Sequence, residues 1–409
     1  MILLEALFLL SFLLITLGLG YLYFLLLAGS ESTRTHRGTD APKRMRFAIA
    51  IPAHNEAEVI ERTVKQLRRM AHPDRLFDVH VVADHCSDET AAVARDAGAE
   101  VHERKAGPRG RKGYALNWLL QRLIADRRNY DAIIVFDADS QVDSQFLVIV
   151  ADKLASGAQV VQGQHIILHP EGGYFNALAH ADMRLNNRIR NQAKDNLGLS
   201  ARLMGDAMAF RRELLERFPW QGVQSLTEDR AYGLHLVTQG VRIHFEPLAR
   251  SYGQAAGRWR DATPQRLRWY GGAFELQRKY LPILWRTIWQ QRSWDALDKL
   301  LELTLPPYSF LAAGAFLLFV AQLFLWRFGQ WPFFLLGWGA VLLALAIAYP
   351  LLGLIVTRSP WPCYRAMLVG PFYVFWRIGI GLWVRMRHGS WAWVRTPRAN
   401  SGSATKHYP

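Results

Sequence analysis

The chain has 409 residues, of which 51% are hydrophobic, and its formal net charge is +15. This length allows one catalytic domain and several membrane segments, but not two large soluble domains. Two cysteines, Cys86 and Cys363, are too few for a disulfide framework or a structural zinc site. The Lys and Arg residues cluster beside apolar segments, as at an anionic membrane leaflet, and no zinc-finger, homeodomain or RNP pattern occurs. We therefore do not expect nucleic acid as a partner.

The N-terminal apolar run, residues 2–27, contains one acidic residue, Glu5. About 20 apolar residues suffice to cross the hydrocarbon core of a bilayer. A cleaved signal peptide is the alternative, but no basic segment precedes the run and no small-residue cleavage site follows it. We predict a retained transmembrane helix over residues 1–28, followed by a basic juxtamembrane linker over residues 29–46.

Between residues 47 and 262, short apolar runs alternate with helical patterns, which predicts an α/β domain with a largely parallel sheet. The predicted strands are Phe47–Ile51, Phe77–Ala83, Ala132–Phe136 and Val160–Gln162. The predicted helices are Glu56–Met70, Glu89–Asp96 and Gly113–Asp126. In such sheets ligands bind beyond the carboxyl ends of the strands.

Three polar motifs follow three of these strands: residues 52–56, 84–90 and 137–139. One such motif alone is typical of an ordinary capped turn, but three at one sheet edge predict a ligand site. In the last of them, Asp137 and Asp139 are separated by one residue. Hard divalent cations prefer oxygen ligands and share them with substrate phosphates. The pair therefore predicts a Mg²⁺ or Mn²⁺ site that holds a diphosphate.

Three further motifs follow in the chain. They are Gly205-Asp206-Ala207, Thr227-Glu228-Asp229 and Gln265-Arg266-Leu267-Arg268-Trp269. The second opens a helical pattern, so its carboxylates could simply complement a helix N-terminus. In the third, the i, i+3, i+4 spacing places Gln, Arg and Trp on one helical face, as an interfacial amphipathic helix also does.

Together these motifs resemble the family 2 glycosyltransferases of the GT-A fold, the group that includes cellulose, hyaluronan and poly-N-acetylglucosamine synthases. The resemblance runs from about Arg46 to Trp269. It implies a Rossmann-like mixed α/β sheet in a cytosolic domain, carried by transmembrane helices and interfacial amphipathic helices. It also implies a membrane-bound, metal-dependent, inverting hexosyltransferase that uses a nucleoside-diphosphate sugar, with a UDP-sugar expected.

The resemblance also implies roles for single residues. The nucleotide-sugar-binding residues are Pro52, Asn55, Glu56, Asp84, Lys112, Gly113, Asp137 and Arg268. The metal ligands are Asp137 and Asp139, and the acceptor-binding residues are Gly205, Asp206, Gln265 and Trp269. Asp229 is the general base, with Glu228 beside it in the catalytic pair.

The chemistry of these residues agrees with those roles. Lys112 supplies a positive charge for an anionic donor, and Gly113 lets the backbone approach the donor closely. An acceptor hydroxyl is a poor nucleophile until a base takes its proton. A solvated Arg111–Lys112 pair on a loop is the alternative for that segment. We leave His54, His85 and His165 unassigned, as hydrogen-bonded loop or core residues.

After the globular region we predict interfacial helices over residues 263–303, a transmembrane hairpin over 304–357, and an interfacial helix with a basic cytosolic tail over 358–409. The apolar stretch Met367–Val384 is interrupted by Arg377, which favours the interface over a span. Basic clusters follow both the first span and this stretch, and only three spans place both on the cytoplasmic side. We therefore predict three spans in a bacterial inner membrane.

The predicted acceptor is a growing polysaccharide or a membrane-held glycan. Transfer of one sugar to a lipid is the alternative, and a catalytically silent membrane subunit on the same fold is a more distant one. Three spans are few for a polymer channel, so such a channel would need interface helices or a second copy of the chain, which leaves a homo-oligomer open.

Overall fold

The computed structural model describes residues 2–30, 45–73, 76–220, 222–256, 258–328 and 333–386. Most of the predicted basic linker and the basic end of the predicted tail lie outside these ranges.

The globular region is built on an eight-stranded mixed sheet with the strand order β3-β2-β1-β4-β7-β6-β8-β5. The strands are β1 Phe47–Ala53, β2 Phe77–Asp84, β3 Glu100–Arg104, β4 Ala132–Val135, β5 Gln141–Val142, β6 Val160–Ile167, β7 Met208–Arg211 and β8 Ile243–Gly253. Strands β3, β2, β1 and β4 pair in parallel, whereas β7 runs antiparallel to both β4 and β6. The predicted mixed α/β sheet is confirmed, and all four predicted strands are present.

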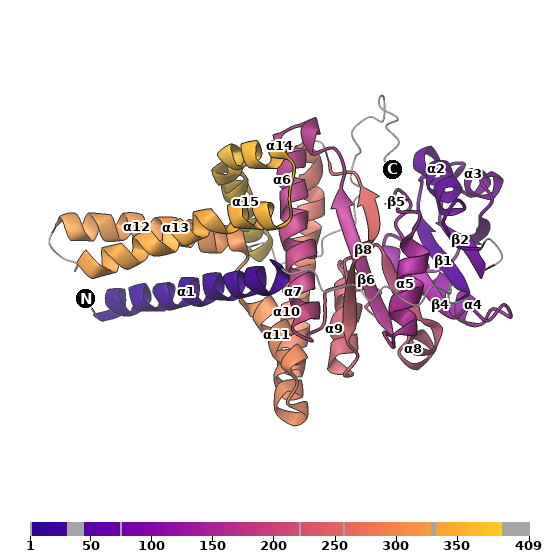
Figure 1. Ribbon diagram of the computed structural model, residues 1–409, viewed down its shortest axis with the longest axis horizontal. Helices are drawn as coiled ribbons and strands as arrows, with labels where there is room; N and C mark the ends of the chain where they lie inside the picture. The colour runs from indigo at the N-terminus through magenta and orange to yellow at the C-terminus, as the bar shows by residue number, and fades with distance from the viewer. Residues whose placement is uncertain are drawn as a thin grey trace.

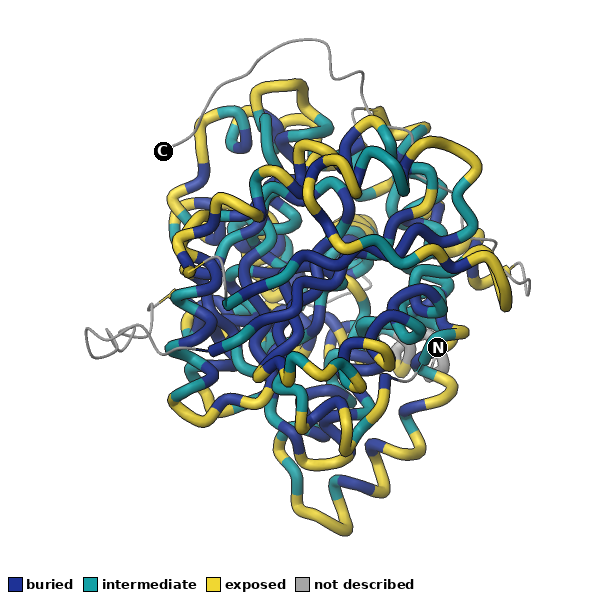
Figure 2. The backbone as a smooth tube through the Cα atoms, turned by 90° about the vertical axis from the view of Figure 1, so that its right-hand side faces the viewer, coloured by how far each residue is buried: buried dark blue, intermediate teal, exposed yellow. Residues whose placement is uncertain are grey.

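Both faces of this sheet are buried, which explains why its strands read as continuous apolar runs. In β1, Phe47, Ile49 and Ile51 belong to one core, while Ala48 and Ala50 belong to the core on the opposite face. This alternation follows from the two-residue period of a strand. Figure 2 shows the buried strands in the middle of the domain and exposed residues on the surrounding segments.

Six helices cover the two faces of the sheet. The first core contains residues of α2 Ala57–Leu67, α3 Thr90–Asp96 and α5 Phe146–Ala155. The opposite core contains residues of α4 Lys112–Ile124, α8 Arg212–Arg217 and α9 Glu228–Thr238. Helices α2, α3 and α4 confirm the three predicted helices to within a few residues at each end, the usual uncertainty of helix boundaries.

A helical layer lies between the sheet and the apolar helices (Figure 1). It consists of α6 Tyr174–Met183, the π-helical segment η3 Arg184–Ile189, α7 Arg190–Asn196, α10 Trp259–Gln291 and α11 Trp294–Thr304. Helix α10 contains the predicted Gln-x-x-Arg-Trp helix. Three tryptophans near the end of this layer, Trp285, Trp289 and Trp294, are exposed, as expected for side chains at a membrane interface.

Three long apolar helices extend together away from the sheet (Figure 1): α1 Ile2–Ser30, α12 Tyr308–Arg327 and α13 Phe333–Val356. Their facing side chains form a core of their own. By length and composition, the described chain has four helical stretches that could cross a membrane, the fourth being Trp361–Met386. This set supports membrane association, and the predicted number of three spans stays a prediction.

The fourth stretch contains α14 Trp361–Ala366 and α15 Gly370–Met386. Helix α15 packs against α10 and α12. Its Arg377 places Nη1 at 2.7 Å from Oδ1 of Asp182 in α6, and its Nε donates to the Tyr270 hydroxyl at 3.4 Å. The charge that interrupts the apolar pattern is therefore satisfied inside the protein.

Candidate active site

A cavity of about 890 Å³ opens at the carboxyl ends of β1, β2 and β4. Most of the predicted site residues line it: Pro52, Glu56, Asp84, Lys112, Asp137, Asp139, Gly205, Asp206, Glu228, Asp229, Gln265, Arg268 and Trp269. The first and last of these residues, Pro52 and Trp269, are separated by more than two hundred positions in the chain. The structure therefore brings the predicted donor, metal, base and acceptor residues to one site.

Asn55 and Gly113 are not among the residues that line the cavity. The backbone N–H of Ser87 donates to Oδ1 of Asn55 at 2.8 Å, which joins the loop after β1 to the loop after β2. A Cβ at Gly113 would lie 3.0 Å from Cα of Val223 and 3.2 Å from Cβ of Glu228. The absence of a side chain at Gly113 thus leaves room for the segment that leads into α9. The sequence had predicted instead that the backbone at Gly113 approaches the donor closely. Both residues shape the site from outside.

Asp84 ends β2 and is buried, with Oδ1 at 2.8 Å from Nε of Arg104. Burial raises the pKa of Asp84, and the Arg104 charge opposes that rise. Arg104 also donates to the carbonyl oxygens of Ala106 and Pro108. It therefore fixes Asp84 relative to the loop that precedes Lys112. The sequence analysis missed this residue because β3 has no clear apolar alternation.

Lys112 begins α4, and its Nζ lies 2.5 Å from Oδ1 of Asp137 and donates to the carbonyl of Gly205 at 2.6 Å. Burial alone would lower the pKa of Lys112, but the charges of Asp137 and Glu228 outweigh it and raise that pKa. Lys112 is thus an ammonium group in the cavity wall, beside the Asp-x-Asp pair. This position rules out, for Lys112, the alternative of a solvated Arg111–Lys112 pair on a loop.

The Asp-x-Asp pair lies among like charges. Burial raises the pKa of Asp137, Lys112 lowers it, and the neighbouring carboxylates Asp206 and Asp139 raise it further. Crowded carboxylates favour a proton or a cation between them. Their oxygens are the ligand type that Mg²⁺ and Mn²⁺ take, so the residues present fit such an ion.

Asp206 has its hydrogen-bonding capacity filled by the protein. Oδ1 accepts from the Asp137 N–H at 2.9 Å and from Oγ of Ser140 at 2.7 Å. Oδ2 lies 2.8 Å from Nδ1 of His165 and accepts from Oγ of Ser251 at 2.5 Å. An ionised carboxylate has about four such acceptor positions. Asp206, predicted to bind the acceptor, therefore mainly positions the loop that carries Asp137.

His165, left unassigned by the sequence analysis, belongs to this arrangement. Burial tends to lower the pKa of His165, but the hydrogen bond to Asp206 and the charges of Asp206 and Asp137 raise it. Burial likewise tends to raise the pKa of Asp206, and His165 holds it well below its usual range. His165 lies in β6, Val160–Ile167, three residues beyond the end of the predicted strand Val160–Gln162, and the sequence gave no signal of this role.

Glu228 and Asp229 occupy the first turn of α9. A Cβ at Gly205 would lie 3.2 Å from Oδ2 of Asp229 and 3.9 Å from Nζ of Lys112, so both groups approach the same backbone position. Burial, followed by the charge of Asp229, raises the pKa of Glu228 to about 7, and Lys112 opposes this rise. The N-terminus of a helix favours negative charge, so the helix supports the pair while the pair also faces the cavity.

Gln265, Arg268 and Trp269 of α10 all line the cavity, which agrees with the predicted common face. The neighbouring Arg266 pairs with Asp182 at 3.1 Å, and its guanidinium lies 4.7 Å from the ring centroid of Trp269. Asp182, which also lines the cavity, therefore joins α6, α10 and α15 beside the predicted acceptor residues.

A second group with metal-ligating side chains, His80, Glu100 and His102, lies on β2 and β3. These residues do not line the cavity. Both carboxylate oxygens of Glu100 accept hydrogen bonds from Arg128, at 2.8 and 3.2 Å. Burial lowers the pKa of His80 to about 4. This group is not placed to hold a donor diphosphate, so the Asp-x-Asp pair is the candidate metal site.

Residues 42–272 match the family model described as "Glycosyltransferase like family 2". A beta-monoglucosyldiacylglycerol synthase of Trichormus variabilis is 26% identical over 271 residues, which cover 64% of this chain and 56% of that protein. A probable glycosyltransferase, YdaM, of Bacillus subtilis is 24% identical over 242 residues, which cover 58% of this chain and 57% of that protein. The chain thus spans just over half of the length of each.

Among solved structures, the chain is similar to the mannosyltransferase PcManGT of Pyrobaculum calidifontis, solved in complex with GDP-Man and Mn²⁺. The TM-score is 0.53 at 18% sequence identity, over 91% of this chain and 98% of that chain. At this identity the likeness shows a shared fold.

Proposed function

The chain belongs to glycosyltransferase family 2, and from this premise we propose that it transfers a sugar from a nucleoside-diphosphate sugar to an acceptor held at the membrane. One observation carries the proposal. The cavity that contains Asp84, Lys112 and Asp137 at the sheet edge is also lined by Leu22 of α1 and Leu311 of α12. A soluble donor and a membrane-held acceptor can therefore reach the same base.

Asp137 and Asp139 would hold Mg²⁺ or Mn²⁺ against the donor diphosphate. The bound ion would neutralise charge that develops on the leaving nucleotide. Lys112 and Arg268 both line the cavity and would add positive charge there, and fixed charges of this kind stabilise a leaving group without reorganisation. A UDP-sugar remains the expected donor.

Asp229 would take the proton of the attacking acceptor hydroxyl, as an inverting transfer requires on the side opposite the leaving nucleotide. Because the pKa of Glu228 is raised to about 7, Glu228 can retain a proton near neutral pH. That proton reduces repulsion within the pair and leaves Asp229 to act as the base. The acidic residues that line one cavity argue against a catalytically silent subunit.

For the acceptor, the geometry favours the second of the two predicted classes, a lipid, over a growing polysaccharide. A Cβ at Gly18 of α1 would lie 2.6 Å from Cδ2 of Leu311 in α12, so these two helices are in direct contact at the membrane end of the cavity. A polymer leaving through this end would have to separate them. The name of the Trichormus variabilis relative also points to a lipid acceptor.

We further propose that the catalytic domain faces the cytosol of a bacterial inner membrane, on the charge rule stated above. The function is tested by incubating membranes that contain the full chain with a panel of radiolabelled nucleoside-diphosphate sugars. Label is expected in the organic-extractable lipid fraction and is expected to vanish with Asp139→Ala. Label in long polymer would support the polysaccharide acceptor, and no incorporation from any donor would overturn the proposal.

A further inference from the structure

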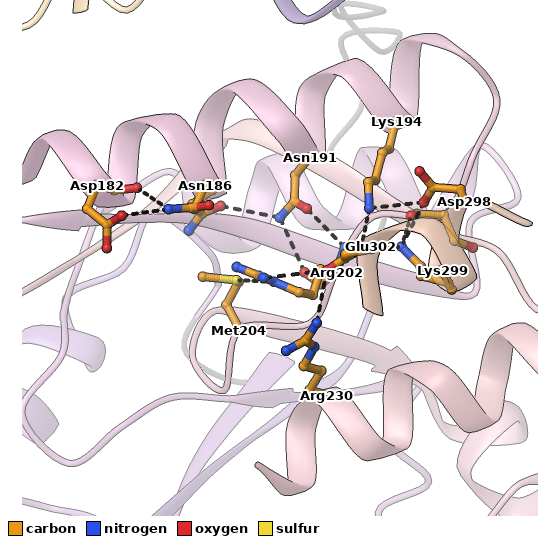
Figure 3. Close-up of polar contacts among 12 residues, drawn as sticks. Asp182, Asn186, Asn191, Lys194, Arg202, Met204, Arg230, Asp298, Lys299 and Glu302 are labelled. Atoms are coloured by element: carbon orange, nitrogen blue, oxygen red, sulfur yellow. Dashed lines mark hydrogen bonds and ion pairs between the residues drawn. The ribbon is translucent and has the colours of Figure 1, made fainter. Parts of the chain in front are cut away.

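Beyond the catalytic pair, the cavity continues into a basic pocket, which we call the inner arm. Its charged wall is formed by Arg190, Lys194, Arg202, Arg230 and Glu302. Arg230 directly follows Asp229 in the first turn of α9, so the inner arm starts beside the proposed base. Figure 3 shows Lys194, Arg202 and Arg230 arranged around Glu302.

Glu302 is shared by several cations. Lys194 forms a short ion pair with it, Nη1 of Arg202 lies 3.4 Å from Oε1, and Nη2 of Arg230 lies 3.6 Å from Oε1. Lys299 lies 3.4 Å from Oε2. One carboxylate cannot neutralise four positive charges, so the surroundings of Glu302 carry an excess of positive charge.

The second carboxylate of this network, Asp298, pairs with Lys194 at 3.0 Å and with Lys299 at 3.4 Å. Within the described residues, the network contains the basic side chains Arg190, Lys194, Arg202, Arg230 and Lys299 and the carboxylates Asp298 and Glu302. Five positive charges against two negative charges leave an excess of three, which the neighbouring Asp229 reduces to two.

Two members of the network, Lys299 and Arg230, have lowered pKa values, in keeping with this excess. Burial and then the charge of Lys194 lower the pKa of Lys299. Burial lowers the pKa of Arg230, the charge of Glu302 opposes this fall, and the charge of Arg202 adds to it. For Lys194, burial tends to lower the pKa, but the charges of Asp298 and Glu302 outweigh it and raise that pKa. Buried charge that has no partner is costly, and a bound anion would compensate it.

The far end of the inner arm is mostly apolar and belongs to the membrane helices. Gly18, Tyr21 and Leu22 of α1 line it, together with Pro307 and Leu311 at the start of α12. The Tyr21 hydroxyl donates to Oδ1 of Asp298 at 2.7 Å, so α1 is bonded directly to the basic network. A ligand that fills this space would meet charge at one end and hydrocarbon at the other.

We propose that the acceptor is a phospholipid with a hydroxyl-bearing anionic headgroup, whose phosphate binds among Arg190, Arg202 and Arg230 and whose acyl chains point toward α1 and α12. This inference rests on the proposed function and names its acceptor. It differs from a neutral diacylglycerol acceptor because a neutral lipid would leave the positive charge of the inner arm uncompensated.

A headgroup hydroxyl oxygen forms a bond to the anomeric carbon of the donor sugar, while the bond from that carbon to the donor diphosphate breaks. The nucleotide leaves with the electron pair, and the hydroxyl proton passes to Asp229. The lipid phosphate is unchanged, since it serves only for binding.

Calorimetric titration tests the proposal by measuring how tightly short-chain lipids bind to the purified full chain in a neutral detergent. The probes are dihexanoyl phosphatidylglycerol, which has phosphate and hydroxyls, and dihexanoylglycerol, which has a hydroxyl without phosphate. Inorganic phosphate serves as the anion alone. We expect phosphatidylglycerol to bind roughly tenfold or more tightly than either of the others, because hydrogen bonds between charged partners are about twice as strong as neutral ones.

The variants Arg190→Gln and Arg202→Gln, singly and combined, should bring the two lipids to similar affinity. Arg242→Gln is the matched control, because Arg242 pairs with Asp195 outside the cavity and loses the same charge. Circular dichroism establishes that each variant is folded. Equal binding of both lipids by the unmodified protein, or a preference that survives the double substitution, would overturn the proposal. If inorganic phosphate bound as tightly as phosphatidylglycerol, the pocket would bind an anion without recognising a lipid, and the proposed lipid acceptor would be wrong.

The same protein separates this inference from the proposed function. In the presence of Mn²⁺, Asp139→Asn should weaken nucleoside diphosphate binding, and Arg190→Gln should leave it unchanged. The preference for phospholipid should be kept by Asp139→Asn and reduced by Arg190→Gln. Nucleotide binding without a phospholipid preference would defeat only the inference. Failure to bind any nucleoside diphosphate would defeat the proposed function.

Discussion

The Nζ atom of Lys112 lies 2.5 Å from Oδ1 of Asp137, so the first residue of α4 is bonded to the first carboxylate of the proposed metal site. The same ammonium group donates to the carbonyl of Gly205, beside the Asp229 carboxylate. One cation thus connects the donor side of the cavity with the proposed base, and substitutions around it should separate binding from chemistry.

The first prediction is that Asp137→Ala and Asp139→Ala abolish transfer and that chelation of divalent cations does the same to the unmodified enzyme. Both follow if the pair holds the ion on the diphosphate. Asp88→Ala is the control, since Asp88 accepts the Thr90 N–H at 3.0 Å and the Ala57 N–H at 3.2 Å. It should cost about 1 kcal/mol of stability, as the loss of a helix cap does. Near-normal rates in purified Asp139→Ala would remove the metal assignment.

The second prediction distinguishes the role of Asp229 as general base from the role of Lys112 in donor binding. Asp229→Asn should keep nucleotide-sugar affinity near normal and lower the transfer rate by about 10²–10⁴, the usual contribution of a positioned general base. Lys112→Ala should chiefly weaken donor binding, because its charge also acts in the ground state. Donor titration and nucleotide release give two independent numbers for each variant. Lost donor affinity in Asp229→Asn, or retained transfer, would mean that α9 only supports the structure.

The third prediction concerns pH. The folded-state pKa of Glu228 is raised to about 7, first by burial and then by the charge of Asp229. The folded chain then binds more protons than the unfolded chain between roughly pH 4.5 and 7, so this group makes stability fall as pH rises through that window. Glu228→Gln should flatten this part of the profile of unfolding midpoint against pH. An unchanged slope between pH 5 and 7 would contradict the raised pKa.

The fourth prediction concerns topology. A reporter fused after Pro409 should report a cytoplasmic terminus, because the basic clusters on both sides of the membrane segments then obey the charge rule. The half-buried pair of Arg377 with Asp182 agrees with α15 lying on the domain. An external reporter signal would mean that Trp361–Met386 crosses the membrane. Asp182→Ala tests the same carboxylate through stability, with an expected loss of about 1–3 kcal/mol because both Arg377 and Arg266 lose their partner.

Local patterns predicted the strands and helices near the donor site well, because β1, β2 and β4 are buried on both faces and each is followed by a polar turn. The sequence did not reveal β7, which is four residues long, or β8, which contains Pro247 and pairs with β6 across a register shift. Strand pairing between distant segments leaves little trace in a local window.

The same reason explains which parts of the site were missed. Asp206 was predicted as a site residue, but its partners His165 and Ser251 come from two other segments, and only the folded sheet edge joins the three. The charged wall of the inner arm comes from α7, α9, α11 and the connection between α7 and β7, and each of these charges looks like an ordinary surface residue in the sequence. The motifs that the sequence did reveal are those that lie in one continuous stretch.

The saturated carboxylate of Asp206 has a consequence for how acceptor preference could change during evolution or engineering. Since all four of its hydrogen bonds stay within the protein, it has nothing left with which to distinguish one acceptor from another. Selectivity must then reside in the helical walls of the cavity, which include residues of α1, α6, α7, α9, α10, α11 and α12. Those walls can be exchanged between relatives while the sheet, its acidic loops and the chemistry they perform stay as they are.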